Sequence, residues 1–510
     1  MHEHLAAIDI GSNAIRMAVA RIENQGNFEI VESTRVPVRL GKDAFTLGYF
    51  TEETIQMAIG AFLRFRNLAQ VFEVKQIRAV GTSALREASN SHLLIDRIAA
   101  QSGIQIEVIN EIEEARLIHL AVQQAIDLKG KRALLIDIGG GSVEVTLSNE
   151  NVLSVESYAL GTVRLLSKLE GSNGSKTFNQ LVSEYADKVR RRIQTQIGSE
   201  NIDLCIATGG NAEEMGRLHK RLFKGDGEDR ILLSEVEKLI EMLNRLSIEE
   251  RIEKLHLRPD RADVLLPAAV VLRMIASIAN AKEIFTPNVG LKDGVLLELS
   301  ASIQGPPKPR REQVLTSALK LGQKYKFDEE HGRFVAKFAS RLFLQSLSLH
   351  NLTEKELLLL EVASLLHDIG HFINTIDHDK HGYYILMNTP IMGLSAKEQE
   401  ILATVVRYHR KDSLSNPDEV FKALSQNERA TVSKLCALME LADALDISHT
   451  ARLQDLILEQ QNHKWKLILV SPDPLLLEKW WVEKRKSLFQ DVFGVQLTVE
   501  VWNGSDTIHH

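Results

Sequence analysis

A strand-and-turn pattern that occurs twice constrains the fold more than any other feature of the chain. Residues 6–13, Ala-Ala-Ile-Asp-Ile-Gly-Ser-Asn, recur as residues 134–142, Leu-Leu-Ile-Asp-Ile-Gly-Gly-Gly-Ser. Each copy is typical of a buried strand that ends in an aspartate and a glycine turn, followed by a second, alternating strand. Asp9 and Asp137 are far enough apart for a complete α/β subdomain. We therefore predict two similar lobes whose glycine turns face each other across a cleft.

The pattern of the remaining segments predicts the domain organisation. Residues 5–36 alternate as a β-meander, and helical periodicity over 52–70, 91–101 and 112–127 then alternates with strands over 76–80, 105–109 and 133–137. Residues 305–311 are rich in proline and basic side chains, so we expect a linker. Leucine-rich helical patterns follow, and the tail has strands at 465–470 and 495–502 around a helix from about 475 to 489. The prediction is a first lobe (1–130), a second lobe (131–304), a linker (305–311), a helical domain (312–450) and a small α+β domain (451–510).

Composition excludes several classes of protein. With 44% hydrophobic and 25% charged residues, the chain is neither disordered, collagen-like nor a coiled coil. The most apolar stretch, residues 264–281, contains Pro267 and Arg273, so we predict a buried helix and no membrane span. Two distant cysteines imply no disulfide framework and favour a reducing, cytoplasmic location. A net charge of −7 disfavours bulk nucleic-acid binding, so a polyanion would need a local basic channel.

The glycine turns have the chemistry of a phosphate cradle. Glycine lets backbone N–H groups converge on an oxyanion, and nearby hydroxyl and amide side chains add donors. The predicted phosphate ligands from the two turns are Gly11, Ser12, Asn13, Gly140, Gly141 and Ser142. Asp9 and Asp137 precede these turns and Glu144 follows the second, so all three carboxylates are candidate ligands of Mg²⁺. Alone, Gly-Gly-Gly-Ser would indicate a flexible linker, but its position between strands and its duplication favour the cradle.

Three further segments fit the same cleft. In residues 80–88 a strand end leads into a helix and carries Thr82, Ser83 and Arg86, of which the arginine could clamp a phosphate. Taken alone, Arg86 is as easily explained as a surface side chain. Residues 207–211 form a third strand–glycine–helix junction with Gly209 and Gly210. Residues 290–295, Gly-Leu-Lys-Asp-Gly-Val, are predicted to open the last helix of the second lobe.

Three glutamates crowd the start of one predicted helix. Glu111, Glu113 and Glu114 suit the helix macrodipole, which explains at least one of them. Crowded carboxylates also raise one another's pKa, which suits a general base acting on water. These two arguments do not show which of the three glutamates would be the general base.

In their order along the chain, these segments resemble the exopolyphosphatase/guanosine pentaphosphate phosphatase (Ppx/GppA) family. The matching segments are 8–13, 81–88, 113–116, 136–142, 208–210 and 290–295. The resemblance implies the acetate and sugar kinase/Hsp70/actin (RNase H-like) fold in both lobes, with Glu114 as the catalytic base. It also implies that Asp137 and Glu144 hold Mg²⁺, that Ser12, Asn13, Arg86, Gly141 and Ser142 bind phosphate, and that the protein is a homodimer. Two residues depart from the family pattern: Glu111 replaces a usual glycine, and Asn211 a common threonine.

The function predicted from this resemblance is Mg²⁺-dependent, processive release of the terminal phosphate of inorganic polyphosphate. Hydrolysis of the 5′-phosphate of guanosine pentaphosphate at the same site is the nearest alternative, since both substrates end in a phosphoanhydride. An actin-like ATP-binding protein, or a regulatory protein that senses a nucleotide such as guanosine penta- or tetraphosphate, is the alternative from another class.

A second constellation lies in the predicted helical domain. His331, His367, Asp368 and Asp443 resemble the ligand pattern of HD-domain phosphohydrolases, which predicts an HD-like fold and a second divalent metal ion. A degenerate fold without metal is the alternative. His378 and His381 are predicted to line a basic polyphosphate path with residues 407–411, or to belong to a solvated loop.

Overall fold

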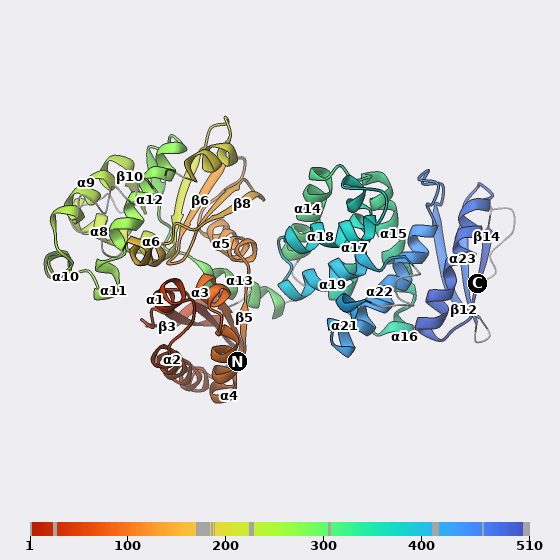
Figure 1. The fold of residues 1–510 in the computed structure, drawn as a ribbon, viewed down its shortest axis with the longest axis horizontal. Coiled ribbons are helices and arrows are strands. Elements are labelled where there is room, and N and C mark those ends of the chain that lie inside the picture. Colours follow the sequence, from red (N-terminus) through yellow and green to blue (C-terminus); the bar gives the residue numbers. More distant parts are fainter. Residues whose placement is uncertain are drawn as a thin grey trace. The chain divides into compact units, whose positions relative to one another are not determined.

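The chain divides into two units, Met1–Pro307 and Lys308–His510, each of which has its own core. The computed structural model describes residues 3–23, 28–169, 184, 187, 189–223, 229–303, 308–410, 418–461 and 464–502. Figure 1 labels the elements of both units.

Two sheets of related topology organise the N-terminal unit. The first has the order β3-β2-β1-β4-β5 and the second the order β10-β11-β9-β6-β7-β8. In each sheet the repeated strand, β1 or β6, pairs antiparallel with the strand that follows it and parallel with a later strand. The duplication in the sequence is therefore a duplication of sheet topology. The strands are β1 His4–Ile10, β2 Ile15–Ile22, β3 Phe28–Val36, β4 Val74–Gly81, β5 Ile106–Val108, β6 Ala133–Ile138, β7 Val143–Ser148, β8 Val152–Tyr158, β9 Leu204–Thr208, β10 Arg230–Leu232 and β11 Glu283–Phe285.

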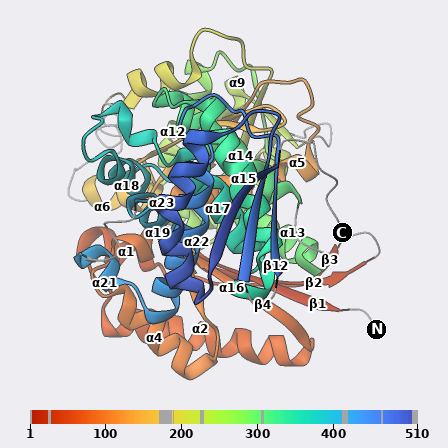
Figure 2. The ribbon, with the colours of Figure 1, turned by 90° about the vertical axis from the view of Figure 1, so that its right-hand side faces the viewer.

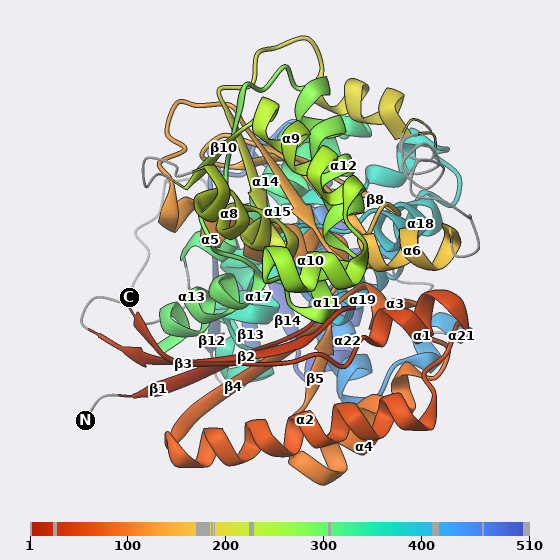
Figure 3. The same cartoon turned by 90° about the vertical axis from the view of Figure 1, so that its left-hand side faces the viewer.

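The alternation of β1 explains how helices cover both faces of the first sheet. Ala6, Ile8 and Ile10 belong to the core beneath α2 and α4, whereas Leu5 and Ala7 belong to the core that contains α5 and α13. Figure 3 shows α2 and α13 on opposite sides of this sheet. The helices are α1 Leu40–Thr46, α2 Glu52–Val71, α3 Ser83–Glu87, α4 Ser91–Ser102, α5 Glu111–Ala125, α6 Thr162–Leu169, α8 Gly209–Phe223, α9 Leu233–Arg245, α10 Ile248–Leu255, α11 Pro259–Ala262, α12 Leu265–Ile278 and α13 Leu291–Ile303.

Helices α5 and α13 join the two lobes. Their apolar side chains share one core with strand residues from both sheets, such as Ala7 of β1 and Leu135 of β6. Residues 290–295 open a helix as predicted, but its assignment to the second lobe is wrong, because α13 packs against β1, β2 and β4 of the first sheet. A helix whose apolar face finds its partner in the other lobe cannot be assigned to a lobe by its position in the chain.

The C-terminal unit is mainly helical and ends in a small sheet. A three-stranded sheet of order β12-β13-β14 lies beside α23 (Figure 2). The helices of the C-terminal unit are α14 Lys308–Lys324, α15 Glu329–Gln345, α16 Leu347–His350, α17 Glu354–Leu366, the 3₁₀ helix η2 Ile369–Phe372, α18 His378–Asn388, α19 Ala396–Arg407, α21 Glu419–Ala423, α22 Gln426–Ala444 and α23 Leu476–Phe493. Its strands are β12 Asp455–Gln461, β13 Lys464–Val470 and β14 Leu497–Trp502.

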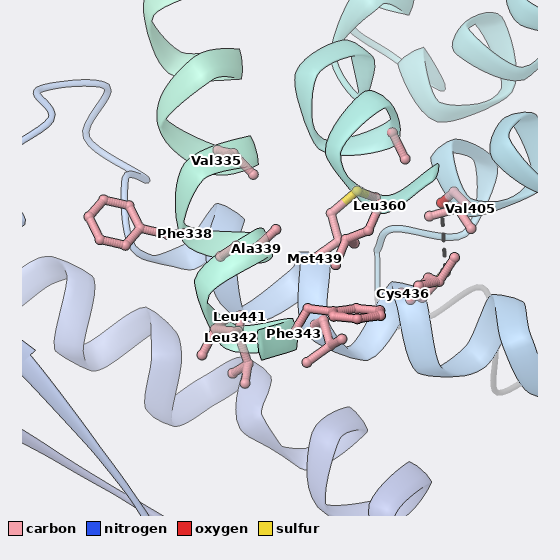
Figure 4. Packing of buried hydrophobic residues seen from close by; sticks show 14 of the residues in the cluster. Val335, Phe338, Ala339, Leu342, Phe343, Leu360, Val405, Cys436, Met439 and Leu441 are labelled. Carbon is pink, nitrogen blue, oxygen red and sulfur yellow. Dashed lines mark hydrogen bonds between the residues drawn. The ribbon is translucent and has the colours of Figure 1, made fainter. Parts of the chain in front are cut away.

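One core runs through the C-terminal unit. Side chains of α15, including Phe338 and Phe343, pack with Leu360 and Met439 (Figure 4). The same cluster includes Leu467 of the sheet, so residues 312–450 and 451–510 form one compact unit rather than the two predicted domains. The prediction had also missed β12, whose residues pair antiparallel with β13.

The predicted linker is shorter than expected. Helix α14 begins at Lys308, so residues 308–311 are helical, and residues 305–307 lie outside the described residues. Proline is tolerated in the first turn of a helix because its missing N–H would have had no partner there.

Other expectations concern apolar segments and cysteines. The buried helix predicted over residues 264–281 is confirmed as α12, and Cys205 and Cys436 are both buried and free. In the part of the chain that the structure describes, no helix combines the length and hydropathy needed to cross a membrane.

Candidate active site

The two glycine turns of the repeat have the same backbone closure. In the first, Gly11 N–H donates to Ala14 O at 3.2 Å, and in the second, Gly139 N–H donates to Ser142 O at 3.1 Å. These bonds engage the first glycine N–H of each turn, so the anion donors must come from the residues that follow. The tight turns place Ser12 and Ser142 at the ends of β1 and β6.

The turns of the two lobes meet directly. Within the first lobe Ser12 Oγ lies 3.0 Å from Ser83 Oγ, and from the second lobe a Cβ on Gly140 would come within 2.9 Å of Ser12 Cβ. A Cβ on Gly141 would overlap Ser83, so only glycine allows this approach. The structure thus confirms the prediction that the glycine turns of the two lobes face each other.

A cavity of about 90 Å³ lies between the turns. Most of the predicted site residues line it: Asp9, Gly11, Ser12, Asn13, Thr82, Ser83, Glu114, Asp137, Gly140, Ser142, Gly209 and Gly210. Arg86, Gly141 and Glu144 are not among its lining residues, and Asn211, Arg16 and Arg261 are. The lining residues include no aromatic side chain.

Three buried carboxylates lie close together beside this cavity, and two of them, Glu114 and Asp137, line it. An oxygen of each of Glu114, Asp137 and Glu144 lies within 4.8 Å of an oxygen of the other two. Asp137 and Glu144 are directly opposed in the β6–β7 ladder, and Asp137 Oδ1 accepts a hydrogen bond from Thr208 Oγ1 at 2.7 Å. Glu144 Oε1 accepts from Ser157 Oγ at 3.0 Å, whereas its buried Oε2 has no hydrogen-bond partner. A group of oxygen donors with one unsatisfied member fits a Mg²⁺ ion.

Burial raises the pKa of each carboxyl group in this cluster, and repulsion within the cluster adds to the rise at Glu114 and Glu144. Burial, and the neighbouring Asp137 charge, raise the pKa of Glu144 to about 7. Burial raises the pKa of Asp137 to about 6, against the hydrogen bond from Thr208. The pKa of Glu114 is raised well above its ordinary value by burial and by Glu144, and Arg86 opposes this rise. A cation among these groups would favour their ionised forms.

This cluster predicts how stability changes with pH when chelator keeps metal away. Unfolded carboxyl groups titrate near about 4, whereas Asp137 and Glu144 titrate at about 6 and about 7 in the folded chain. Between those values the folded state holds more protons, so the stability of the N-terminal unit should fall as pH rises, by up to about 1.4 kcal/mol per pH unit for each group. Chemical unfolding across pH measures this slope. A Glu144→Gln variant should have a flatter profile, and parallel profiles would contradict the prediction.

The geometry distinguishes the three glutamates at the start of α5. Glu113 accepts two hydrogen bonds of 2.7 Å from Arg116, away from the cavity lining. The Glu111 side chain is 42% exposed and pairs with Arg86. Glu113 and Glu114 are both buried, but of the three glutamates only Glu114 lines the cavity, as expected of the base that the family resemblance implied.

Arg86 occupies a different position from the one predicted. Its Nη1 donates to Ile109 O at 2.7 Å and to Glu114 Oε2 at 3.2 Å, and its Nε lies 3.2 Å from Glu111 Oε1. Arg86 therefore fixes the orientation of Glu114 instead of lining the cavity. Glu111, which replaces the usual glycine, has its charge compensated by the same guanidinium.

Comparison of the two repeats explains why Asp9 is not part of the carboxylate cluster. Asp9 is directly opposed to Arg16 in the β1–β2 ladder, at the place where Asp137 is opposed to Glu144 in β6–β7. Burial raises the pKa of Asp9, and the charge of Arg16 opposes that rise. One repeat thus sets a carboxylate opposite an arginine, whereas the other sets two carboxylates opposite each other.

Sequence reasoning missed the cations of the cavity. Arg16 lies 3.5 Å from Glu213, and Arg261 Nη1 donates to Asn211 Oδ1 at 2.8 Å. Burial and the neighbouring Arg16 lower the pKa of Arg261 to about 9, so these cations repel one another and would be stabilised by an anion. The register of the β1–β2 hairpin could have revealed Arg16, but Arg261 is far away in sequence from every predicted motif.

The second predicted constellation also comes together, within the C-terminal unit. His331 Nε2 and His367 Nε2 lie 3.3 Å apart, and Asp443 Oδ1 lies 3.5 and 3.4 Å from them. Asp368 Oδ1 lies 3.6 Å from His367 Nε2. His378 is fully buried beside Asp368 and does not line a basic surface path as predicted.

Both halves of the chain match profiles of one known protein family. The sequence profile of the Ppx/GppA phosphatase family matches residues 18–302, and that of Ppx/GppA phosphatase, domain III, matches residues 314–483. Relatives named guanosine-5′-triphosphate,3′-diphosphate pyrophosphatase occur in Photobacterium profundum and Vibrio vulnificus. Each is 24% identical over 441 residues, which cover 85% of this chain and 85% of the relative.

Solved structures match about three fifths of the chain. An exopolyphosphatase from Cytophaga hutchinsonii is 26% identical with a TM-score of 0.56, over 59% of this chain and 98% of that one. The Ppx/GppA family member of Aquifex aeolicus is 22% identical with a TM-score of 0.52, over 60% of this chain and 100% of that one, and supports the two-lobed actin-like fold alone.

Proposed function

Because the chain belongs to the Ppx/GppA phosphatase family, whose members hydrolyse phosphoanhydride bonds, we propose that it releases orthophosphate processively from the ends of inorganic polyphosphate. The observation that carries this proposal is the buried Glu114 at a small cavity lined by hydroxyl, amide and guanidinium groups. The cavity of about 90 Å³ suits a terminal phosphoryl group and is far smaller than the roughly 300–1,000 Å³ of sites that enclose a drug-sized ligand.

The chain's own residues can bind and orient that terminal phosphate. Ser12, Asn13 and Ser83 offer donors from the first lobe, and Ser142 offers one from the second. Arg16 and Arg261 add positive charge to the lining of the cavity, where a bound anion would relieve their mutual repulsion. Preorganised donors of this kind stabilise the charge of a transferring phosphoryl group.

Glu114 is proposed as the general base. Burial raises the pKa of Glu114, which makes its carboxylate a stronger base towards water than an exposed glutamate. Arg86 donates a hydrogen bond to one carboxylate oxygen of Glu114, Oε2, and so fixes the orientation of this side chain. The other carboxylate oxygen is then the one that accepts the proton of water. The attacking oxygen of water forms the new P–O bond, the bridging P–O bond breaks, and the water proton passes to Glu114.

Mg²⁺ is the cofactor we propose for this site. Asp137 and Glu144 would hold it, since they supply opposed carboxylates and one unsatisfied buried oxygen. When bound, the ion supplies Lewis-acid stabilisation of phosphoryl oxygens.

Guanosine pentaphosphate is the second candidate substrate, since curated relatives over most of the chain are named for it. We favour polyphosphate because a solved structure that matches the chain at 26% identity is named an exopolyphosphatase, and because the described residues that line the cavity include no aromatic platform for a base. Polyphosphate offers a terminal phosphoanhydride without requiring any such platform.

The test is orthophosphate release with Mg²⁺ from long-chain polyphosphate and from guanosine pentaphosphate, measured as kcat/KM. We expect higher kcat/KM for polyphosphate and loss of activity with chelator. A preference for guanosine pentaphosphate would overturn the choice of substrate, and absence of release from both would overturn the proposed reaction. ATP-dependent filaments without phosphate release would instead support the actin-like alternative. Tight nucleotide binding without phosphate release would support the regulatory alternative.

We further propose that the protein is a cytoplasmic homodimer. Sedimentation tests the oligomeric state, and cell fractionation tests the location.

A further inference from the structure

Two buried histidines of the C-terminal unit direct lone pairs at each other. His331 Nδ1 lies 2.9 Å from Asp446 Oδ2, and His367 Nδ1 lies 2.9 Å from the Ser364 carbonyl oxygen. A carboxylate and a carbonyl only accept, so each neutral ring carries its proton on Nδ1 and a lone pair on Nε2. The two Nε2 atoms are nevertheless 3.3 Å apart, with Asp443 Oδ1 within 3.5 Å of both. A cation held between the two rings and Asp443 would accept both lone pairs and relieve this repulsion.

A second set of the same kind lies beside the first. His378 Nδ1 lies 3.1 Å from Thr375 O, and His409 Nδ1 lies 2.6 Å from Val406 O, so these rings also carry their protons on Nδ1. His378 Nε2 is buried, has no hydrogen-bond partner and lies 3.3 Å from Asp368 Oδ1. Ligand atoms of His378, His409 and Asp368 lie within 4.8 Å of one another.

Asp368 connects the two sets. Its Oδ1 lies 3.3 Å from His378 Nε2 and 3.6 Å from His367 Nε2. Asp443 Oδ2 pairs with Arg485, which leaves Oδ1 for the imidazoles. We propose that the C-terminal unit binds two divalent transition-metal ions, one at His331, His367 and Asp443 and one at His378 and His409, with Asp368 reaching both.

The chemistry of the donors supports transition metals over Mg²⁺. Imidazole nitrogen suits iron, nickel or zinc, and the carboxylates of the set also suit Mn²⁺, whereas Mg²⁺ prefers an all-oxygen shell. The fixed Nδ1 protons are the second-shell hydrogen bonds that orient metal-binding imidazoles. His378 and His409 extend the four-residue pattern seen in the sequence from one ion to two.

A cavity of about 620 Å³ lies against this cluster and indicates the class of substrate. Asp368, His409 and Asp443 line it, together with the aromatic side chains of Tyr325, Phe327 and Phe372 and the cations Lys326, Arg410 and Arg485. Its volume is in the range of sites for small organic ligands. Aromatic faces suit a base and guanidinium groups a phosphate, so the ligand class we infer is a phosphate ester of a nucleotide.

The reaction we infer is hydrolysis of that ester. The oxygen of water forms a bond to phosphorus, the ester P–O bond breaks, and the proton of water passes to the departing alcohol oxygen. Paired metal ions stabilise both the attacking and the leaving oxygen in such displacements. The inference is independent of the proposed polyphosphatase activity, because every residue it uses lies in the other unit.

Mn²⁺ binding to the full chain tests the metal site directly. After chelator treatment, we expect titrated Mn²⁺ to give the electron paramagnetic resonance spectrum of a spin-coupled pair. Asp368→Asn should abolish the coupling and weaken binding at least about tenfold. His378→Gln should remove one ion, while His381→Gln, the same change on the same helix outside the cluster, should retain both. No coupled signal in the wild type, or coupling that survives Asp368→Asn, would mean protonated histidines and would overturn the site.

Hydrolysis of bis(para-nitrophenyl) phosphate with Mn²⁺ tests the reaction class. The activity should survive Glu114→Gln and fall at least about a hundredfold in Asp368→Asn, as expected when a metal-assisted step is lost. Loss in Glu114→Gln alone would assign the ester hydrolysis to the N-terminal cleft and overturn this part of the inference. Bound ions without any hydrolysis would overturn it as well.

Discussion

Replacing Glu114 with glutamine is expected to lower orthophosphate release from polyphosphate by about 10²- to 10⁴-fold. The amide keeps the shape of the side chain but cannot accept the water proton. Arg86, which now pairs with Glu114 Oε2, can still pair with Glu111, so we expect the fold to be kept. The measurement is kcat with saturating Mg²⁺ and polyphosphate, together with a melting curve for the same variant.

Glu111→Gln is the matched control for that variant. Glu111 stands on the first turn of the same helix and contacts the same guanidinium, but it does not line the cavity. Its replacement should change kcat only a few-fold. An equal loss in both variants would show that the charge around Arg86 matters and that no proton passes to Glu114, and full activity in Glu114→Gln would remove it from the mechanism.

Gly294→Ala is expected to damage both stability and activity. A Cβ at this position of α13 would overlap the carbonyl of Leu117 on α5, one turn beyond Glu114. Both partners are helix backbone and cannot yield as a flexible side chain does, so the helices must separate, at a cost of about 1–3 kcal/mol or more. That loss outweighs the gain of about 0.5–1 kcal/mol that alanine gives in a helix. The melting temperature of the N-terminal unit and the rate of phosphate release should fall together.

Gly290→Ala provides the comparison within the same segment. No atom lies within 4 Å of the place where its Cβ would stand, so its melting temperature should match that of the wild type. Equal stability of the two variants would mean that the close contact between α5 and α13 is unimportant.

Much of the fold could be predicted from alternation and duplication. The meander over residues 5–36 appears as β1, β2 and β3, and the repeated segments end in turns closed in the same way. Sequence spacing also predicted a second carboxylate beside Asp137, since a hairpin with a tight turn sets Glu144 opposite it. These features depend on residues close together in the chain.

Features that depend on distant partners could not be predicted. Arg86 pairs with Glu114 because two separate helices converge, and Arg261 reaches the cavity from α11. The surroundings of His378 could not be predicted either, because helical periodicity does not show that the carboxylate of Asp368 lies beside its ring. Periodicity gives the buried face of a helix but not the surface that covers it.

The position of α13 has a consequence for the synthesis of the protein on the ribosome. Strand β1 ends at Ile10, but α13, which covers one face of its sheet, begins only at Leu291. At about 5–20 residues per second, that helix is made roughly 15–60 s after the strand that it covers. Throughout that time Leu5, Ala7 and Ala20 lack part of their apolar cover. The first lobe, although translated first, can complete its folding only after the second lobe has been made, so the nascent chain has a long interval in which a chaperone can bind it.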